Sequence, residues 1–194
     1  ELVDATGKER VQYFRHETNV GSLKNFETCL NLAQGHFIHL LHGDDYVLDG
    51  YYKKMPELFQ SHPDAGAACC NIQYVDQKGN LINHQPREQN NDGLLSDWLL
   101  KIAKRQRLQY CAVSVRRKVY EELGGFYGAH YGEDWEMWAR IAARYEFAYT
   151  PETLASYRRH TDSISGRYLK TGQNISDIRW VIDQIQQYLP PDKR

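Results

Sequence analysis

Two adjacent carboxylates, Asp44 and Asp45, are the residues of this chain whose types and spacing best suit chemistry. They follow Gly43 and an apolar segment, 36–41, that predicts a buried strand. In an open α/β sheet, ligands bind at the carboxyl ends of the strands, and carboxylate oxygens are the ligands that hard divalent cations prefer. Because side chains alternate along an extended segment, one carboxylate can bind a metal while its neighbour faces a ribose or a phosphate. A solvated acidic turn is the commoner explanation of a bare Gly-Asp-Asp, so this segment alone leaves both interpretations open.

A second acidic pair, Glu133 and Asp134, begins an amphipathic pattern that predicts a helix over 134–145. Acidic residues are common in the first turn of a helix because the helix dipole stabilises negative charge there. The functional alternative is a general base that the helix end keeps ionised and directs into a cleft. Ordinary capping is the commoner of the two explanations.

Two further segments have a structural and a functional interpretation. Gly124 and Gly125 fit the end of a helix or, less commonly, a loop whose backbone lies against a bound ligand. His160 follows two arginines, which is typical of an exposed position. If the fold returns His160 to Asp45, however, its imidazole can be a nitrogen ligand of the same metal ion.

Length, composition and charge limit the class of protein. The chain has 194 residues, of which 41% are apolar, enough for one domain over 1–194 with a C-terminal helix and tail over 172–194. The 24 basic and 25 acidic residues give a net charge of −1, without the basic excess of nucleic-acid-binding proteins, so we expect no nucleic acid partner. No apolar run approaches the roughly 18 residues of a membrane span, and the cysteines lack metal-ligand spacing. We therefore expect a cytoplasmic protein, with association with the inner face of the membrane left open.

The elements that must position these residues alternate between strands and helices along the chain. The main strands are expected over 11–14, 36–41, 65–74 and 108–115, and the main helices over 23–33, 51–60, 94–103, 117–123, 134–145 and 175–189. A polar segment, 83–93, is expected to form a mobile loop. Such alternation predicts an α/β domain with a mostly parallel sheet flanked by helices.

Taken together and in this order, the motifs resemble those of glycosyltransferase family 2, inverting enzymes of the Rossmann-like GT-A fold that use nucleotide-sugar donors. The resemblance rests on four elements: Asn19-Val20-Gly21 with Asn25; Leu41-His42-Gly43-Asp44-Asp45; Gly124-Gly125-Phe126 followed by Gly132-Glu133-Asp134-Trp135; and Tyr157-Arg158-Arg159-His160 with Ser163-Ile164-Ser165. Their conjunction covers most of the chain and is far more specific than any one of them.

The resemblance implies a donor site with a divalent metal, Mg²⁺ or Mn²⁺. Asp45 would hold the metal that binds the donor diphosphate, His160 would be a further metal or diphosphate contact, and Asp44 would lie near the ribose or sugar of the donor. The remaining donor-site residues would be Asn19, Gly21, Gly124 and Gly125.

The resemblance also implies an acceptor site. Asp134 would be the catalytic base that removes the proton of the acceptor hydroxyl, with Glu133 beside it. Trp135, Tyr131 and Trp98 would offer flat apolar surfaces to sugar rings, although each is more commonly a packing residue.

The implied activity is metal-dependent, inverting transfer of a sugar from a nucleotide-diphosphate-sugar to a saccharide or lipid-linked acceptor, in the synthesis of a polysaccharide or cell-surface glycan. The alternatives are a non-catalytic GT-A-like module that binds a glycan or a protein, and a metal-dependent phosphohydrolase or nucleotidyltransferase. Peripheral membrane contact through four basic residues is left open, although a solvated helix face is the simpler explanation of these residues. They are Lys101, Lys104, Arg105 and Arg107.

The chain departs from the family pattern in two places. His42 occupies a position that is Asp in many members, but the carboxylate pair after it is intact, so we expect metal binding to survive. The strand–helix–strand unit that opens the family and grips the nucleotide base is not visible before Val11. We therefore expect an N-terminally truncated chain that lacks this first unit and whose own turnover is poor or absent.

Overall fold

The computed structural model describes residues 11–160, 166, 168 and 171–194. Within these residues a seven-stranded mixed sheet has the strand order β1-β6-β3-β7-β2, with β4 added beside β3 and β5 beside β7. The strands are β1 (Phe37–His39), β2 (Tyr46–Val47), β3 (Ala65–Val75), β4 (Leu81–His84), β5 (Gly93–Leu94), β6 (Val113–Arg116) and β7 (Glu146–Arg158).

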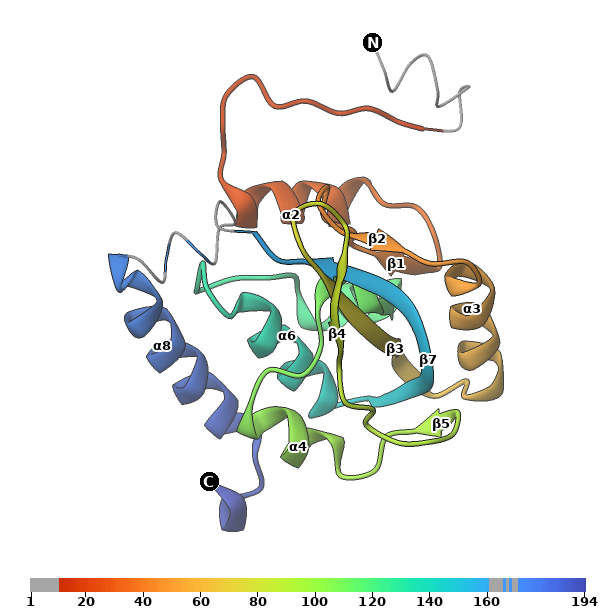
Figure 1. Cartoon of the computed structure of the whole chain (residues 1–194). Coiled ribbons are helices and arrows are strands. Elements are labelled where there is room, and N and C mark those ends of the chain that lie inside the picture. Colours follow the sequence, from red (N-terminus) through yellow and green to blue (C-terminus); the bar gives the residue numbers. More distant parts are fainter. Residues whose placement is uncertain (1–10, 161–165, 167, 169–170) are drawn as a thin grey trace.

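Helices surround this sheet (Figure 1). They are α2 (Ser22–Leu32), α3 (Tyr51–Ser61), α4 (Trp98–Lys104), α5 (Arg117–Leu123), α6 (Glu133–Ala142) and α8 (Gln173–Tyr188), with short 3₁₀ turns η1 (Tyr110–Ala112) and η2 (Pro191–Lys193). Helix α3 packs against β3 and β7, whereas α6 packs against α4, α5 and α8. The α/β class expected from the sequence is therefore confirmed.

The sheet is mixed, and the expectation of a mostly parallel sheet is wrong. Only the central β3–β7 pair is parallel among the described strands; the pairs β1–β6, β2–β7, β3–β4, β3–β6 and β5–β7 are antiparallel. Alternation of strand and helix patterns predicts the type of each element but does not determine strand direction. Here β4 returns along β3 through a tight turn, and β6 runs against both of its neighbours.

Strand β7 is one long element, whereas the sequence pattern predicts two short strands over 146–149 and 154–158. Its register with β3 shifts near Cys70 and Asn71, and the strand curves across the sheet (Figure 1). Beyond the shift, Ser156 pairs with Tyr46 at the start of β2. Because of this curvature, the end of β7 lies beside the segment that carries Asp44 and Asp45.

Small residues allow close packing around β3, whose first six residues are buried. A Cβ atom at Gly66 would lie 2.5 Å from Cβ of Tyr145, just after α6, so a larger residue cannot fit without a backbone shift. On the other side of α6, Val181 and Ile185 of α8 are buried in the same core as Trp138. This packing fixes the axis of α6 and hence the position of its first turn.

The segment before α2 differs from the sequence expectation of a strand over 11–14. These residues have no strand assignment, and the side chains of Val11, Tyr13 and Phe14 are 55%, 65% and 56% exposed. A strand needs a hydrogen-bonded neighbour, and no described strand pairs with this segment.

None of the helices in the described residues is long and apolar enough to span a membrane.

Candidate active site

A cleft of about 1440 Å³ gathers segments that are far apart in the sequence. It is lined by the start of α2 with the residues before it, the loop before β2, the segment between α4 and η1, the first turn of α6 and the end of β7. Ligand sites are typically concave and few per protein, so this cleft is the candidate active site.

The first acidic pair lies on one wall of the cleft. Oδ1 of Asp45 accepts a 2.9 Å hydrogen bond from the backbone N–H of Arg158. Oδ2 of Asp44 lies 2.9 Å from Nε2 of His160, and the backbone carbonyl of Asp44 accepts from Nε of Arg158 at 2.9 Å. The end of β7 therefore meets both carboxylates, and the predicted return of His160 to this pair takes place through Asp44 rather than Asp45.

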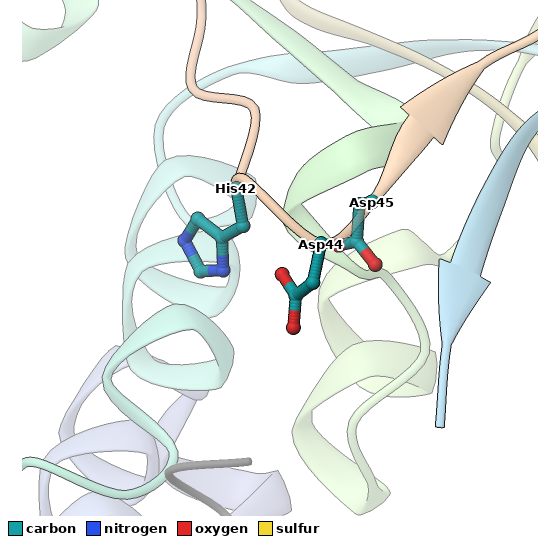
Figure 2. Close-up of side chains that lie close together, drawn as sticks. All are labelled: His42, Asp44 and Asp45. Carbon is teal, nitrogen blue, oxygen red and sulfur yellow. The ribbon is translucent and has the colours of Figure 1, made fainter. Parts of the chain in front are cut away.

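His42 completes a three-residue group (Figure 2). His42, Asp44 and Asp45 can each offer one ligand atom, and these atoms lie within 4.8 Å of one another. Ligands bonded to one cation at about 2.0–2.3 Å lie at most about 4.6 Å apart, so the three side chains need only a small approach to share an ion. The imidazole packs between Phe26, at 5.1 Å between ring centroids, and Tyr110, at 4.3 Å.

The protonation of this group suits a divalent cation. Burial raises the pKa of Asp45 to about 6 against the hydrogen bond from Arg158, and the charge of Asp44 adds to the rise. Burial also lowers the pKa of His42, which keeps the imidazole neutral at physiological pH. Nε2 of His42 is buried without a hydrogen-bond partner among the described residues. Two carboxylates and a neutral imidazole form a donor set that fits Mg²⁺ or Mn²⁺, because a cation removes the repulsion between the carboxylates.

The second acidic pair lies on another wall of the same cleft, in the first turn of α6. Oδ1 of Asp134 accepts from the backbone N–H of Trp135 at 2.7 Å, and its Oδ2 accepts from Nε2 of Gln106. Oε1 of Glu133 accepts from the Tyr110 hydroxyl at 3.1 Å. Burial raises the pKa of both carboxyl groups, and for Glu133 repulsion from Asp134 adds to the rise.

Tyr110 and Gln106 are site residues that the sequence did not reveal. Tyr110 connects the second acidic pair to His42, since its hydroxyl donates to Glu133 while its ring packs against the imidazole. Neither residue belongs to a recognisable motif, and only the fold of the segment from the end of α4 to η1 brings them to the cleft.

The other predicted donor-site residues divide into two groups. Asn19 and Gly21 line the cleft, where Oδ1 of Asn19 accepts from the backbone N–H of Gly21 at 2.9 Å. Gly124 and Gly125 are not among the lining residues. Nη2 of Arg140 donates to the carbonyl of Gly125 at 2.7 Å, and a Cβ atom at Gly125 would lie 3.0 Å from Leu30. This placement favours the structural interpretation of the two glycines.

The predicted acceptor-site aromatics divide in the same way. Tyr131 and Trp135 line the cleft beside the second acidic pair. Trp135 is held by a 2.6 Å hydrogen bond from Nε1 to the carbonyl of Ile102. Trp98 is 5% exposed, packs against Phe147 and does not line the cleft.

The basic residues of α4 and its following loop have separate environments. Lys104 and Arg105 are exposed and line the cleft. Arg107 is instead paired with Glu88, with Nη1 2.8 Å from Oε1 and side-chain exposures of 20% and 8%. Arg107 therefore forms an internal contact with Glu88 and is not part of a basic outer surface.

The fold defines the class of protein to which this chain belongs. It is similar to the crystal structure of S. aureus TarS, with a TM-score of 0.64 and 14% sequence identity, over 91% of this chain and 31% of TarS. The chain therefore has the GT-A fold of glycosyltransferases.

The chain belongs to Glycosyl transferase family 2, whose sequence model matches residues 1–124. This match includes Asp44 and Asp45 and ends before Glu133. Glu133, Asp134 and His160 are thus placed at the site by the structure rather than by the family match.

Two relatives illustrate how far the similarity extends. Uncharacterized protein MT1568 of Mycobacterium tuberculosis is 28% identical over 185 residues, 87% of this chain and 57% of the relative. An uncharacterized glycosyltransferase of Methanocaldococcus jannaschii, MJ1057, is 22% identical over 151 residues, 77% of this chain and 51% of the relative. This chain spans about half the length of the relatives that it matches.

Proposed function

We propose that the protein is a metal-dependent inverting glycosyltransferase. It transfers a sugar from a nucleotide-diphosphate-sugar to a hydroxyl group of a saccharide or lipid-linked acceptor, in the synthesis of a polysaccharide or cell-surface glycan. The observation that carries this proposal is the presence of both acidic pairs, Asp44–Asp45 and Glu133–Asp134, on the walls of one cleft.

The first pair is the proposed metal and donor site. Asp45 would hold the cation, with Asp44 and His42 as neighbouring donors and His160 as a further contact through Asp44. A Mg²⁺ or Mn²⁺ ion bound there would supply Lewis-acid neutralisation of the nucleoside diphosphate as it leaves. Arg158 orients the pair through its hydrogen bonds to Asp45 and to the carbonyl of Asp44.

The second pair is the proposed catalytic site. The acceptor oxygen forms a bond to the anomeric carbon while the bond from that carbon to the diphosphate oxygen breaks, and Asp134 receives the hydroxyl proton. One displacement of this kind inverts the anomeric carbon without a covalent enzyme intermediate. A base with a pKa raised toward neutrality suits this step, because it is ionised at working pH and still binds the transferred proton.

Neighbouring cleft residues suggest how the acceptor is held. Tyr131 and Trp135 are positioned to contact a sugar ring beside Asp134. Lys104 and Arg105, exposed residues that line the same cleft, are positioned for an anionic part of the acceptor or for the headgroups of a membrane that carries a lipid-linked acceptor.

The test uses the full-length protein, because this chain spans about half the length of its relatives. Binding of nucleoside diphosphates is measured by calorimetry with Mn²⁺ and with a chelator, and nucleotide-sugars are then screened for transfer. We expect Mn²⁺-dependent binding that Asp45→Asn weakens by at least about tenfold. The control Asp64→Asn, at an exposed position between α3 and β3, should bind normally. Absence of metal-dependent binding to any nucleoside diphosphate would contradict the proposal.

Asp134→Asn separates an enzyme from a non-catalytic module of the same fold. An enzyme loses turnover by about 10²–10⁴-fold and still binds the donor. A module that only binds a glycan or a protein is indifferent to this substitution. Release of inorganic phosphate or a hydrolysed phosphate ester without sugar transfer would instead indicate a phosphohydrolase.

A further inference from the structure

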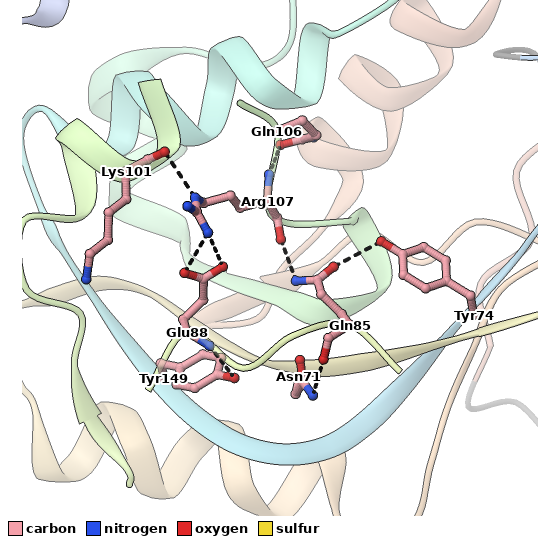
Figure 3. Close-up of polar contacts among 8 residues, drawn as sticks. All are labelled: Asn71, Tyr74, Gln85, Glu88, Lys101, Gln106, Arg107 and Tyr149. Carbon is pink, nitrogen blue, oxygen red and sulfur yellow. Dashed lines mark hydrogen bonds and ion pairs between the residues drawn. The ribbon is translucent and has the colours of Figure 1, made fainter. Parts of the chain in front are cut away.

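A partly buried ion pair anchors the segment that follows α4. Nη1 of Arg107 lies 2.8 and 3.0 Å from the carboxylate oxygens of Glu88, and Nε of Arg107 donates to the carbonyl of Lys101 at 3.1 Å (Figure 3). The guanidinium thus joins the last turn of α4 to the polar segment between β4 and β5. A charged pair with such low exposure holds its geometry well, because separation would leave either charge poorly solvated.

The segment that carries Glu88 is itself fixed to the sheet. Gln85 donates from Nε2 to the carbonyl of Arg107 at 2.7 Å and accepts from the Tyr74 hydroxyl at 3.0 Å (Figure 3). The carbonyl of Gln85 accepts from Nδ2 of Asn71 at 3.1 Å. These contacts connect the backbone at Arg107 to β3 through two successive side chains.

Gln106 is directed by this anchored backbone. Its Oε1 accepts a 3.0 Å hydrogen bond from the backbone N–H of Arg107, and its Nε2 donates to Oδ2 of Asp134. The first contact determines which end of the carboxamide faces the cleft. A flipped amide would place two acceptor oxygens together and remove the bond to Arg107, so the NH₂ end must face Asp134.

We propose that Gln106 is a positioning residue that orients the carboxylate of Asp134 for proton removal, and that the Glu88–Arg107 ion pair holds Gln106 in place. The inference rests on the proposed role of Asp134 as the base. With Oδ1 bound to Trp135 and Oδ2 to Gln106, rotation of the carboxylate is restrained. Each oxygen keeps a second lone pair, so the acceptor hydroxyl can still bind.

Other titratable groups also face this acidic pair. Glu133 lies beside Asp134 on α6, Tyr110 approaches from η1, and Tyr157 interacts electrostatically with Asp134 from β7. Asp177 of α8 interacts electrostatically with Glu133 and accepts hydrogen bonds from the backbone before α6. Among the hydrogen bonds of the described residues, the side-chain donor to Asp134 is Gln106.

The test compares Gln106→Met with Gln109→Met in the full-length protein. Gln109 lines the same cleft, so the control repeats the loss of an amide without touching Asp134. A hydrogen bond to the charged form favours ionisation, so loss of this bond in Gln106→Met should raise the pKa of Asp134. The acidic limb of the pH profile of kcat should therefore shift to higher pH by about one unit. It should also lower kcat by about tenfold near neutral pH and leave the KM for the donor within about twofold. Gln109→Met should leave the acidic limb in place.

The anchor is tested with Glu88→Gln, which removes the charge but keeps an acceptor for Arg107. We expect a smaller shift of the acidic limb in the same direction, with the melting temperature recorded to show that the variant is folded. If Gln106→Met matches Gln109→Met in both its acidic limb and its kcat, the inference is overturned.

A direct measurement distinguishes failure of this inference from failure of the proposed function. The carboxyl carbon of Asp134 is titrated by NMR without substrates, in the native protein and in Gln106→Met. If Asp134→Asn keeps full turnover, the base is elsewhere and both proposals fail for catalysis, whatever the titration shows. If Asp134→Asn abolishes turnover but Gln106→Met changes neither the titration nor the kcat profile, only the positioning role fails.

Discussion

Arg158 and Asp45, 113 positions apart, are joined by a 2.9 Å hydrogen bond from a backbone N–H to a carboxylate oxygen. The bond exists because β7 curves along β3 and then pairs with β2, just after the acidic segment. A backbone donor cannot be removed by side-chain substitution, so Asp45 is oriented by the fold itself. The proposed metal site is thus built from two segments that are far apart in the sequence, while its candidate ligands come mainly from one short segment.

His42 should influence which metal binds. His42→Phe keeps an aromatic ring between Phe26 and Tyr110 but removes the nitrogen, so we expect Mn²⁺ affinity to fall about tenfold while the melting temperature changes little. His42→Asp replaces the nitrogen with oxygen, and because Mg²⁺ prefers oxygen ligands, the ratio of Mg²⁺ to Mn²⁺ affinity should rise. Calorimetry of the metal ions alone measures both. Unchanged affinities in both variants would exclude His42 as a ligand.

Turnover should depend on the ionisation of Asp134. Burial raises the pKa of Asp134 to about 7, and a general base must be deprotonated to act. We therefore expect kcat to be highest above about pH 8 and to fall toward tenfold per pH unit below about pH 6. A pH series at saturating donor and metal measures this limb. A flat profile between these values would assign the base to another group.

The sequence predicted the parts of the site that depend on local pattern. Helices α2, α6 and α8 follow from apolar residues at helical spacing, and the acidic pairs stand out because they end a strand and begin a helix. Gln106 and Tyr110 could not be predicted in this way. Their roles come from tertiary contacts across α4, η1 and α6, and no local pattern encodes such contacts.

The direction of each strand could not be predicted from the sequence either. A strand segment such as 113–116 has the same composition in a parallel or an antiparallel sheet, and β6 proves antiparallel to both neighbours. The Glu88–Arg107 ion pair shows a related limit. The basic set of α4 and its following loop gave no sign that Arg107 is internal, because the partner of Arg107 lies in a polar segment that the sequence presents only as a loop.

Glu133 should make the stability of the metal-free protein depend on pH. Burial raises the pKa of Glu133 to about 8 in the folded protein, well above about 4.3 for an unperturbed glutamate. The folded state therefore binds this proton more tightly, and the resulting stability is complete below about pH 4 and is lost as the pH rises toward about 8. Glu133→Gln, which can still accept from Tyr110, should raise the melting temperature near pH 8 and not near pH 4. Equal effects on the melting temperature at both pH values would show that the pKa of the Glu133 carboxyl group is not raised in the folded protein.

Arg140 should be the most costly cation of the described residues to remove. It lies 3.1 Å from the fully buried carboxylate of Glu136 and donates to the carbonyls of Leu123 and Gly125 at 2.6 and 2.7 Å. Arg140→Met leaves Glu136 buried without its cation, which costs about 3–5 kcal/mol and should lower the melting temperature by about 10 °C.

Two matched variants identify the cause of this loss. Arg144→Met, at an exposed position just after α6, should change the melting temperature by no more than about 1–2 °C. Adding Glu136→Gln to Arg140→Met should recover part of the loss, because the unpaired charge is removed while an acceptor for the Tyr188 hydroxyl remains. If the double variant is no more stable than Arg140→Met, the loss comes from the freed carbonyls of the Leu123–Gly125 loop and not from the buried charge.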